Sequence, residues 1–283
     1  MRSTVGESSV LMWIVSVAVL LLASRTFVQY LRRLVYEGPL RMWRELLAGS
    51  FALTAGVWSS AVLGVHAMGL SFEIGYHPLK TSASVAAAFV AVVLIVGFTT
   101  FRPRWYGQIA AAVVLGLVAL VLQVGTIWAI GAEPGFMWRR EALVFAALVA
   151  MAGLGLGGRI VVAARRGSRT DRGGFRLLAA LLMGACLVAS QELVLSAAGL
   201  DRQVASSHAR FLSEMANLLV AGALVPLVLA LMLADQYAQR RARASRRARR
   251  KRGRPASAHA SESRFSESLL ASELSDLNDA ARR

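Results

Sequence analysis

The chain has 283 residues, of which 56% are hydrophobic and only 17% are charged, whereas about a quarter of a soluble domain is charged. The charges lie between long apolar runs and not on amphipathic faces, which excludes a soluble domain as the main body of the protein. The net charge of +16 would suggest a nucleic-acid partner in a soluble protein. Here 13 of the 32 Lys and Arg residues follow Gln239 and most others crowd into alternate loops. We therefore predict contact with membrane lipid and no nucleic-acid partner.

Seven stretches of the chain reach the roughly 20 apolar residues that a helix needs to cross a bilayer. They lie at residues 10–31, 46–70, 81–101, 108–131, 142–164, 175–200 and 211–235. Pro39, Pro78, Pro103 and Pro134 fall between these stretches, and Pro226 is expected to kink the last one. The predicted fold class is all-α, a polytopic membrane protein with seven transmembrane helices. No acid–base pair or ligand set for catalysis is recognisable, so we do not expect an enzyme.

The distribution of basic residues predicts the orientation of these helices. Segments 32–45, 102–107 and 159–176, together with the C-terminal tail, carry 25 Lys and Arg residues, and the alternate segments carry six. The basic side is expected to be cytoplasmic, which places the N-terminus outside and the C-terminus inside. Arg outnumbers Lys 30 to 2, a usage typical of a high-GC bacterial genome, so we predict a multi-pass protein of the cell inner membrane.

The chain divides into four predicted parts: an outer segment 1–9, a membrane domain 10–235, a basic juxtamembrane segment 236–254 and a Ser- and acid-rich tail 255–283. Basic residues near anionic lipid headgroups contribute about 1 kcal/mol each. The residues expected to make these contacts are Arg241, Arg243, Arg246, Arg247, Arg249, Arg250, Lys251 and Arg252. The tail either forms an amphipathic helix that docks on a cytoplasmic signalling partner or is disordered.

Stretches 46–70, 108–131 and 175–200 share a layout, in which a small residue near the middle precedes a polar position in the outer half. The most informative run starts at Gly56-Val57-Trp58-Ser59 and continues through Gly64 to Tyr76-His77-Pro78. It resembles the bacterial MHYT-domain family, whose seven-helix membrane domain holds three copies of a Met-His-Tyr-Thr-like motif near the outer helix ends. The resemblance covers residues 10–235. It implies three degenerate internal repeats and a sensory or signalling function.

The motif positions themselves differ from the family pattern. The motif His and Met residues of the family are the proposed ligands of a metal, suggested to be copper. The matching positions here are Ser60-Ala61, Leu122-Gln123 and Ser190-Gln191. Copper prefers imidazole, thiolate or thioether ligands. We therefore expect neither the metal nor any other cofactor.

Polar residues within the apolar stretches are the remaining candidates for function, because burying them is unfavourable. Gln123, Gln191, Glu192 and His66 lie in the outer halves of their stretches, at similar depth. They either form a proton-sensitive or small-ligand site, with Glu192 ionisable and His66 as its partner, or serve structure. In the structural alternative the glutamines hydrogen-bond across helices. The sequence favours a sensory or signalling protein; the alternative is a small transporter or channel that uses Gln123, Gln191 and Glu192.

Overall fold

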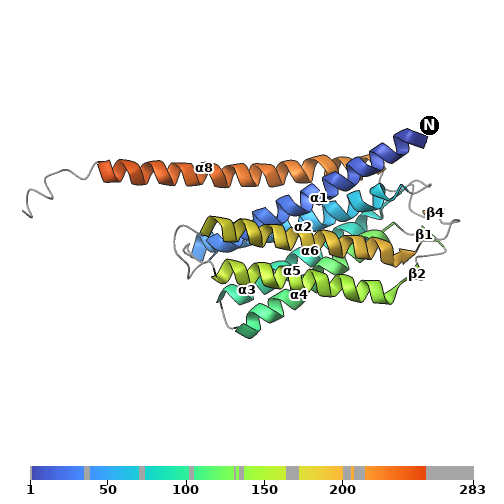
Figure 1. Ribbon diagram of the computed structural model, residues 1–283, viewed down its shortest axis with the longest axis horizontal. Helices are drawn as coiled ribbons and strands as arrows, with labels where there is room; N and C mark the ends of the chain where they lie inside the picture. The colour runs from blue at the N-terminus through green and yellow to red at the C-terminus, as the bar shows by residue number, and fades with distance from the viewer. Residues whose placement is uncertain are drawn as a thin grey trace, which may run out of the picture. The chain divides into compact units, whose positions relative to one another are not determined.

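A computed structural model describes residues 2–34, 39–69, 74–101, 105–130, 132–133, 137–163, 172–199, 205–206 and 214–252. These residues are almost entirely helical (Figure 1). The helices are α1 (Arg2–Arg33), α2 (Pro39–Ala67), α3 (Pro78–Phe101), α4 (Trp105–Trp128), α5 (Arg140–Ala163), α6 (Arg172–Ala197), α7 (Glu214–Leu219), η1 (Val220–Leu224) and α8 (Val225–Arg252). The last three are consecutive and share one apolar span, Met215–Gln239. Within the described ranges seven helical spans are long and apolar enough to cross a membrane, which confirms that part of the prediction.

The chain separates into two compact units, Met1–Met232 and Leu233–Arg283. The first unit holds α1 to α7, η1 and the first residues of α8, and it contains the packed bundle. Of the second unit, the structure describes the remainder of α8 up to Arg252.

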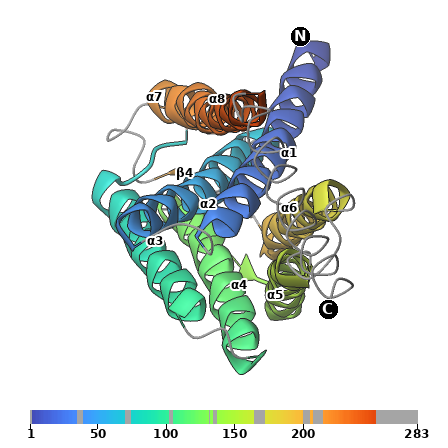
Figure 2. The same cartoon turned by 90° about the vertical axis from the view of Figure 1, so that its left-hand side faces the viewer.

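Helix α2 lies at the centre of the first unit, as the end-on view shows (Figure 2). It contacts α1, α3, α4, α6 and η1. In its apolar span 78% of the residues are buried, against 22–44% in the other six spans. The outer helices turn large apolar side chains outward, among them Leu94, Val121 and Phe145, as expected of surfaces that face lipid. Helix α2 is therefore the element through which most of the others are connected.

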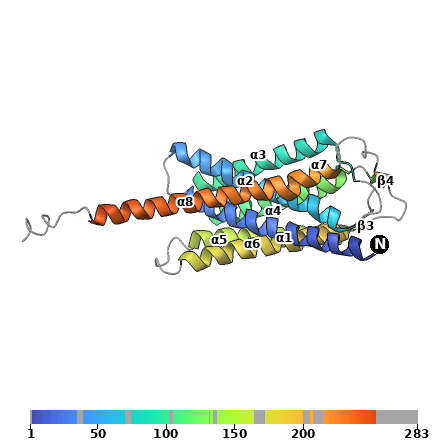
Figure 3. The same cartoon turned by 90° about the horizontal axis from the view of Figure 1, so that it is seen from above.

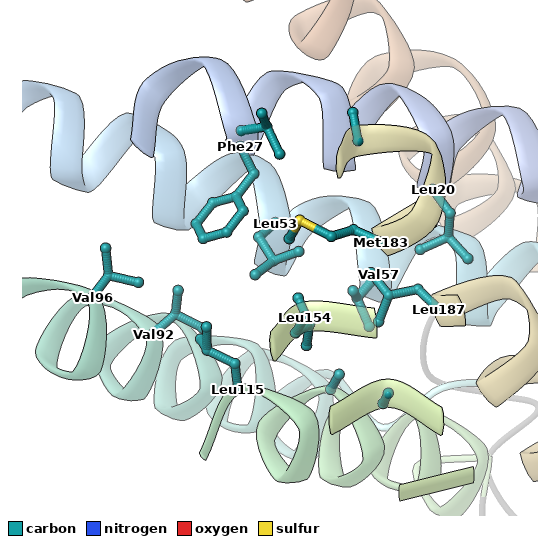
Figure 4. Close-up of a cluster of buried hydrophobic side chains, with 14 of the residues drawn as sticks. Leu20, Phe27, Leu53, Val57, Val92, Val96, Leu115, Leu154, Met183 and Leu187 are labelled. Atoms are coloured by element: carbon teal, nitrogen blue, oxygen red, sulfur yellow. The ribbon is translucent and has the colours of Figure 1, made fainter. Parts of the chain in front are cut away.

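The bundle core consists of branched and aromatic side chains from α1 to α6, which point toward one another (Figure 4). It includes Leu20, Phe27, Leu53, Val57, Val92, Val96, Leu115, Leu154, Met183 and Leu187. Small residues let the helices approach closely enough for this packing. Gly153 of α5 leaves no room for a side chain against Cys186 of α6, and Gly56 of α2 likewise lies against Ala23 of α1.

The start of α2 corrects one prediction. Residues 32–45 were expected to form a loop, but α2 begins at Pro39, so Arg44 and Glu45 are helical. Helix α3 likewise begins at Pro78. Proline suits the first position of a helix because its fixed φ is already helical and its missing N–H would have no intrahelical partner there.

Two short strand pairs, which the apolar pattern did not predict, join the loops at the end of the bundle where α1 begins (Figure 3). Strand β1 (Ala132–Glu133) pairs antiparallel with β4 (Ala205–Ser206), with Ala132 opposite Ser206. Strand β2 (Met137–Trp138) pairs antiparallel with β3 (Ala198–Gly199). The pairs satisfy backbone groups of the α4–α5 and α6–α7 connections.

The irregularity expected at Pro226 takes the form of the π-helical turn η1, immediately before the proline. Proline cannot donate a backbone hydrogen bond and its ring clashes with the preceding turn. A π-turn inserts an extra residue into the helix and relieves such a clash. Within η1 the N–H of Val225 bonds to the carbonyl of Val220.

The α5–α6 contact yields a test of this packing. Gly153→Ala should lower the thermal unfolding midpoint, because the added methyl group collides with Cys186 and overpacking costs about 1–3 kcal/mol. Gly158→Ala on the same helix has nothing within 4 Å and should be neutral or stabilising by up to about 1 kcal/mol, since Ala favours helix over Gly. Thermal denaturation in lipid nanodiscs measures both. Equal midpoints for the two variants would contradict the packing described here.

Candidate functional site

A closed hydrogen-bond network joins Ser16 of α1, Ser60 of α2 and Gln191 of α6. The amide Nε2 of Gln191 donates to Ser16 Oγ at 2.9 Å and to the Ser60 carbonyl at 3.1 Å. Ser60 Oγ donates to Gln191 Oε1, and Ser16 Oγ donates to the Ser60 carbonyl at 3.0 Å. All three residues are buried. Every side-chain donor in the network thus has an acceptor, so we call these residues the Ser16–Ser60–Gln191 network.

Gln123 of α4 lies in a second, weaker polar pair. Ser190 Oγ of α6 donates to Gln123 Oε1 over a long distance of 3.4 Å. Gln123 is only 1% exposed, and within the described residues its Nε2 has no hydrogen-bond partner. The two predicted glutamines therefore both reach across helices, but they form separate groups.

The six motif positions do not fit a copper ion. Ser60, Gln191, Ser190 and Gln123 use hydroxyl and amide groups to bond one another, and such groups are poor ligands for copper. The other two, Ala61 and Leu122, are buried apolar residues. Among the residues that the structure describes, no three His, Cys, Asp or Glu side chains come together as a metal site would require.

Glu192, next to Gln191 in α6, lines a crevice between α1, α2 and α6. The crevice has a volume of about 460 Å³ and is lined by Ser9, Val10, Trp13, Gly64, Ala67, Met68, Glu192, Leu195 and Ser196. Glu192 is exposed, and its Oε1 accepts a hydrogen bond from Trp13 Nε1 at 2.7 Å. We call this space the Glu192 crevice.

The Glu192 crevice and the Ser16–Ser60–Gln191 network meet at Gly64. A Cβ atom at Gly64 would overlap the Gln191 amide, while Gly64 itself lines the crevice. Because glycine has no side chain, only its backbone separates the two. A group that enters the crevice therefore comes close to the amide that holds three helices together.

The ligand-site interpretation made His66 the partner of Glu192, but the contacts of His66 in the structure are with other residues. Its Nδ1 lies 2.8 Å from the Val62 carbonyl, and its ring stacks on Tyr76 with centroids 6.3 Å apart. Within the described residues no hydrogen bond or ion pair joins His66 to Glu192. Helical geometry explains this, because residue 66 is rotated by about 200° from Gly64, whereas residues 67 and 68 return to the crevice.

Sequence reasoning also missed Ser59, which bonds to the last span. Ser59 Oγ donates to the Ala221 carbonyl at 2.5 Å. In a π-helical turn this carbonyl would accept from residue 226, and residue 226 is a proline without an N–H. Ser59 of α2 therefore supplies the donor that Pro226 lacks. The combination of Pro226 and an intramembrane serine was the available signal, but the sequence alone does not reveal that they meet.

A buried ion pair was missed as well. Arg33 Nη1 of α1 lies 3.4 Å from Glu45 Oε1 of α2, and the two side chains are only 7% and 12% exposed. From the sequence, Arg33 was expected to mark the cytoplasmic side and Glu45 to lie in a loop. An acid among the basic residues of segment 32–45 was the signal for this pair.

The expected lipid contacts of the basic segment stay a prediction. Helix α8 continues to Arg252 and Arg241 is exposed. The side chains of Arg243, Arg246, Arg247, Arg249, Arg250, Lys251 and Arg252, and the whole tail 255–283, lie outside the described residues.

No family model, curated protein or solved structure matches this chain. The class is therefore defined by the fold: an almost entirely helical protein with seven membrane-length apolar spans.

The network predicts opposite outcomes for the two glutamines. Gln191→Leu should destabilise the protein by about 1–3 kcal/mol, because Ser60 Oγ loses its amide acceptor and Ser16 Oγ loses its amide donor while both hydroxyls stay buried. Gln123→Leu should cost less than about 1 kcal/mol, since the nitrogen of the native amide has no hydrogen-bond partner among the described residues. Thermal or denaturant unfolding in nanodiscs compares them. A larger loss for Gln123→Leu would show that the network has been misassigned.

The Ser59 bond predicts a local effect on the π-turn. Ser59→Ala leaves the Ala221 carbonyl without a donor, so backbone amides at 220–225 should exchange with solvent faster. The matched control is Ser82→Ala, because the Ser82 hydroxyl is exposed and bonds only within α3. Hydrogen-exchange mass spectrometry reads both variants. Unchanged protection in Ser59→Ala would refute a supporting role for this hydroxyl.

Proposed function

We propose that this chain is a bacterial inner-membrane protein of the sensory or signalling type, which takes its input at the Glu192 crevice. The observation that carries the proposal is the Gly64 contact, where the crevice meets the Gln191 amide. A ligand that displaces this amide disturbs hydrogen bonds to α1 and α2 together. The resemblance to the MHYT-domain family supports a sensory role, but the residues here do not support its metal.

The route of the signal follows from two adjacent serines. Ser60 belongs to the network and Ser59 bonds to the π-turn, and successive residues of a helix point about 100° apart. A small rotation or shift of α2 therefore changes both bonds together. Shifts of packed helices are a common way to transmit a signal. The π-turn lies in the span that continues into the basic, predicted cytoplasmic segment, which is the proposed output.

A fluorescent reporter tests this coupling. Cys186 is the sole cysteine of the sequence, so Arg241→Cys in a Cys186→Ala background gives one labelling site on exposed α8. Gln191→Leu and Ser59→Ala should each change the emission of the reporter in nanodiscs, because Ser59 bonds to the π-turn of the last span and Gln191 bonds to the adjacent Ser60 of α2. Gln123→Leu should leave the emission unchanged.

The reporter and a flux measurement distinguish the signalling function from the transporter alternative. Reporter emission that is identical in all variants, at temperatures where each is folded, would refute the signalling route. Proteoliposomes of the unsubstituted chain should show no cation flux above empty vesicles. A flux that is lost in Glu192→Gln would instead establish the transporter alternative.

A further inference from the structure

We infer that the Glu192 crevice binds a small organic cation, a protonated amine or a quaternary ammonium group with a short apolar body. This inference rests on the proposed function, in which the crevice is the input site, and it names the class of ligand. Three properties of the crevice support it: its hydrogen-bonding groups, its charge, and its size and lining.

Hydrogen bonds within the protein already occupy three donors of the crevice, those of Trp13, Ser196 and Met68. The indole N–H of Trp13 donates a hydrogen bond to Glu192 Oε1. The Ser196 hydroxyl donates to the Leu193 carbonyl at 2.8 Å, and the backbone N–H of Met68 bonds to Val65 at 3.2 Å. The second Glu192 oxygen and the lone pairs of Ser196 remain as acceptors. An anionic or acceptor-rich ligand would therefore meet carboxylate oxygens, whereas a donor or a cation is complementary.

Among the described residues, none neutralises the charge of Glu192. No described cationic side chain lies within ion-pair distance of Glu192. The carboxylate is exposed and is held in place by the Trp13 N–H. A carboxylate beside an indole ring is a combination suited to ammonium groups, which are attracted by the charge and by the π face.

The size and walls of the crevice favour an organic cation over a metal ion. Its 460 Å³ is within the range of small-molecule sites. Val10, Ala67, Met68 and Leu195 give it an apolar wall, against which a hydrocarbon body can pack. A hard metal ion needs six or more oxygen ligands, and Glu192 is the sole carboxylate in the lining.

Binding to the full-length chain in nanodiscs of zwitterionic lipid tests the ligand class. The probes are tetramethylammonium, tetraethylammonium and choline, with 3,3-dimethylbutan-1-ol as the uncharged analogue of choline. The cations should raise the thermal midpoint and titrate in calorimetry, and the uncharged analogue should do neither at the same concentration. An equal response to choline and its neutral analogue would overturn the inference.

Variants locate the site. Glu192→Gln should weaken cation binding at least about tenfold, because it removes the charge but keeps the shape. Glu141→Gln is the matched control, since Glu141 is an exposed acid in the first turn of α5 and does not line the crevice; it should bind as the unsubstituted chain does. Trp13→Phe keeps an aromatic ring and should stay within about threefold, while Trp13→Leu should lose about tenfold.

Failure of this inference can be told from failure of the proposed function. If Glu192→Gln keeps its thermal midpoint without ligand but binds cations as tightly as the unsubstituted chain, the ligand class at this site is refuted. If the cations bind through Glu192 but the reporter at position 241 does not respond to them, the ligand class stands and the signalling role fails. If Gln191→Leu moves the reporter but no cation binds, only the ligand class fails.

Discussion

Inside an apolar bilayer a hydroxyl or amide has no water to bond, so each buried polar side chain depends on a partner within the protein. The Ser16–Ser60–Gln191 network meets this constraint with two hydroxyls, one amide and one backbone carbonyl. Apolar packing alone determines the rotation of a helix in a membrane only loosely, because lipid tails and Leu side chains are equally apolar. The network adds specific bonds that restrict how α1, α2 and α6 are rotated relative to one another. Helix α2, at the centre of the bundle, contributes Ser60 to this set of bonds.

The same constraint explains why the last span is tied to α2. Pro226 removes a backbone donor and is accommodated by the π-turn, and this leaves the Ala221 carbonyl for Ser59. The cost of the proline is thus offset in another helix, more than 160 positions away in sequence. Ser59 bonds to the π-turn, and the adjacent Ser60 belongs to the network. A shift of α2 at these residues therefore affects both sets of hydrogen bonds.

The parts of this structure that could be predicted are those set by local composition. Apolar runs of sufficient length predicted the seven spans, whereas Pro39 and Pro78, which were expected between the spans, are the first residues of α2 and α3. The partners of Gln191 could not be predicted, because they depend on how α1, α2 and α6 are rotated about their axes. His66 also shows that sequence gives the depth of a residue but not the direction of its side chain. It lies at a depth similar to that of Glu192, but it contacts the Val62 carbonyl, whereas Glu192 contacts Trp13. The contact between Trp13 and Glu192 could not be predicted either, because it depends on how α1 and α6 face each other.

The arrangement of charge around Gly64 bears on the choice between sensing and transport. Adjacent residues of α6 divide the roles: the neutral amide of Gln191 is buried, and the charged carboxylate of Glu192 remains at the exposed crevice. A transported cation would have to leave this carboxylate and pass the network, where the Gln191 oxygen and the Ser60 carbonyl are already taken up by internal donors. Crossing there means breaking several buried hydrogen bonds without replacing them, at about 1–3 kcal/mol for each unsatisfied group. In the proposed sensing role, a cation binds at the crevice and shifts the amide behind Gly64 without crossing the network.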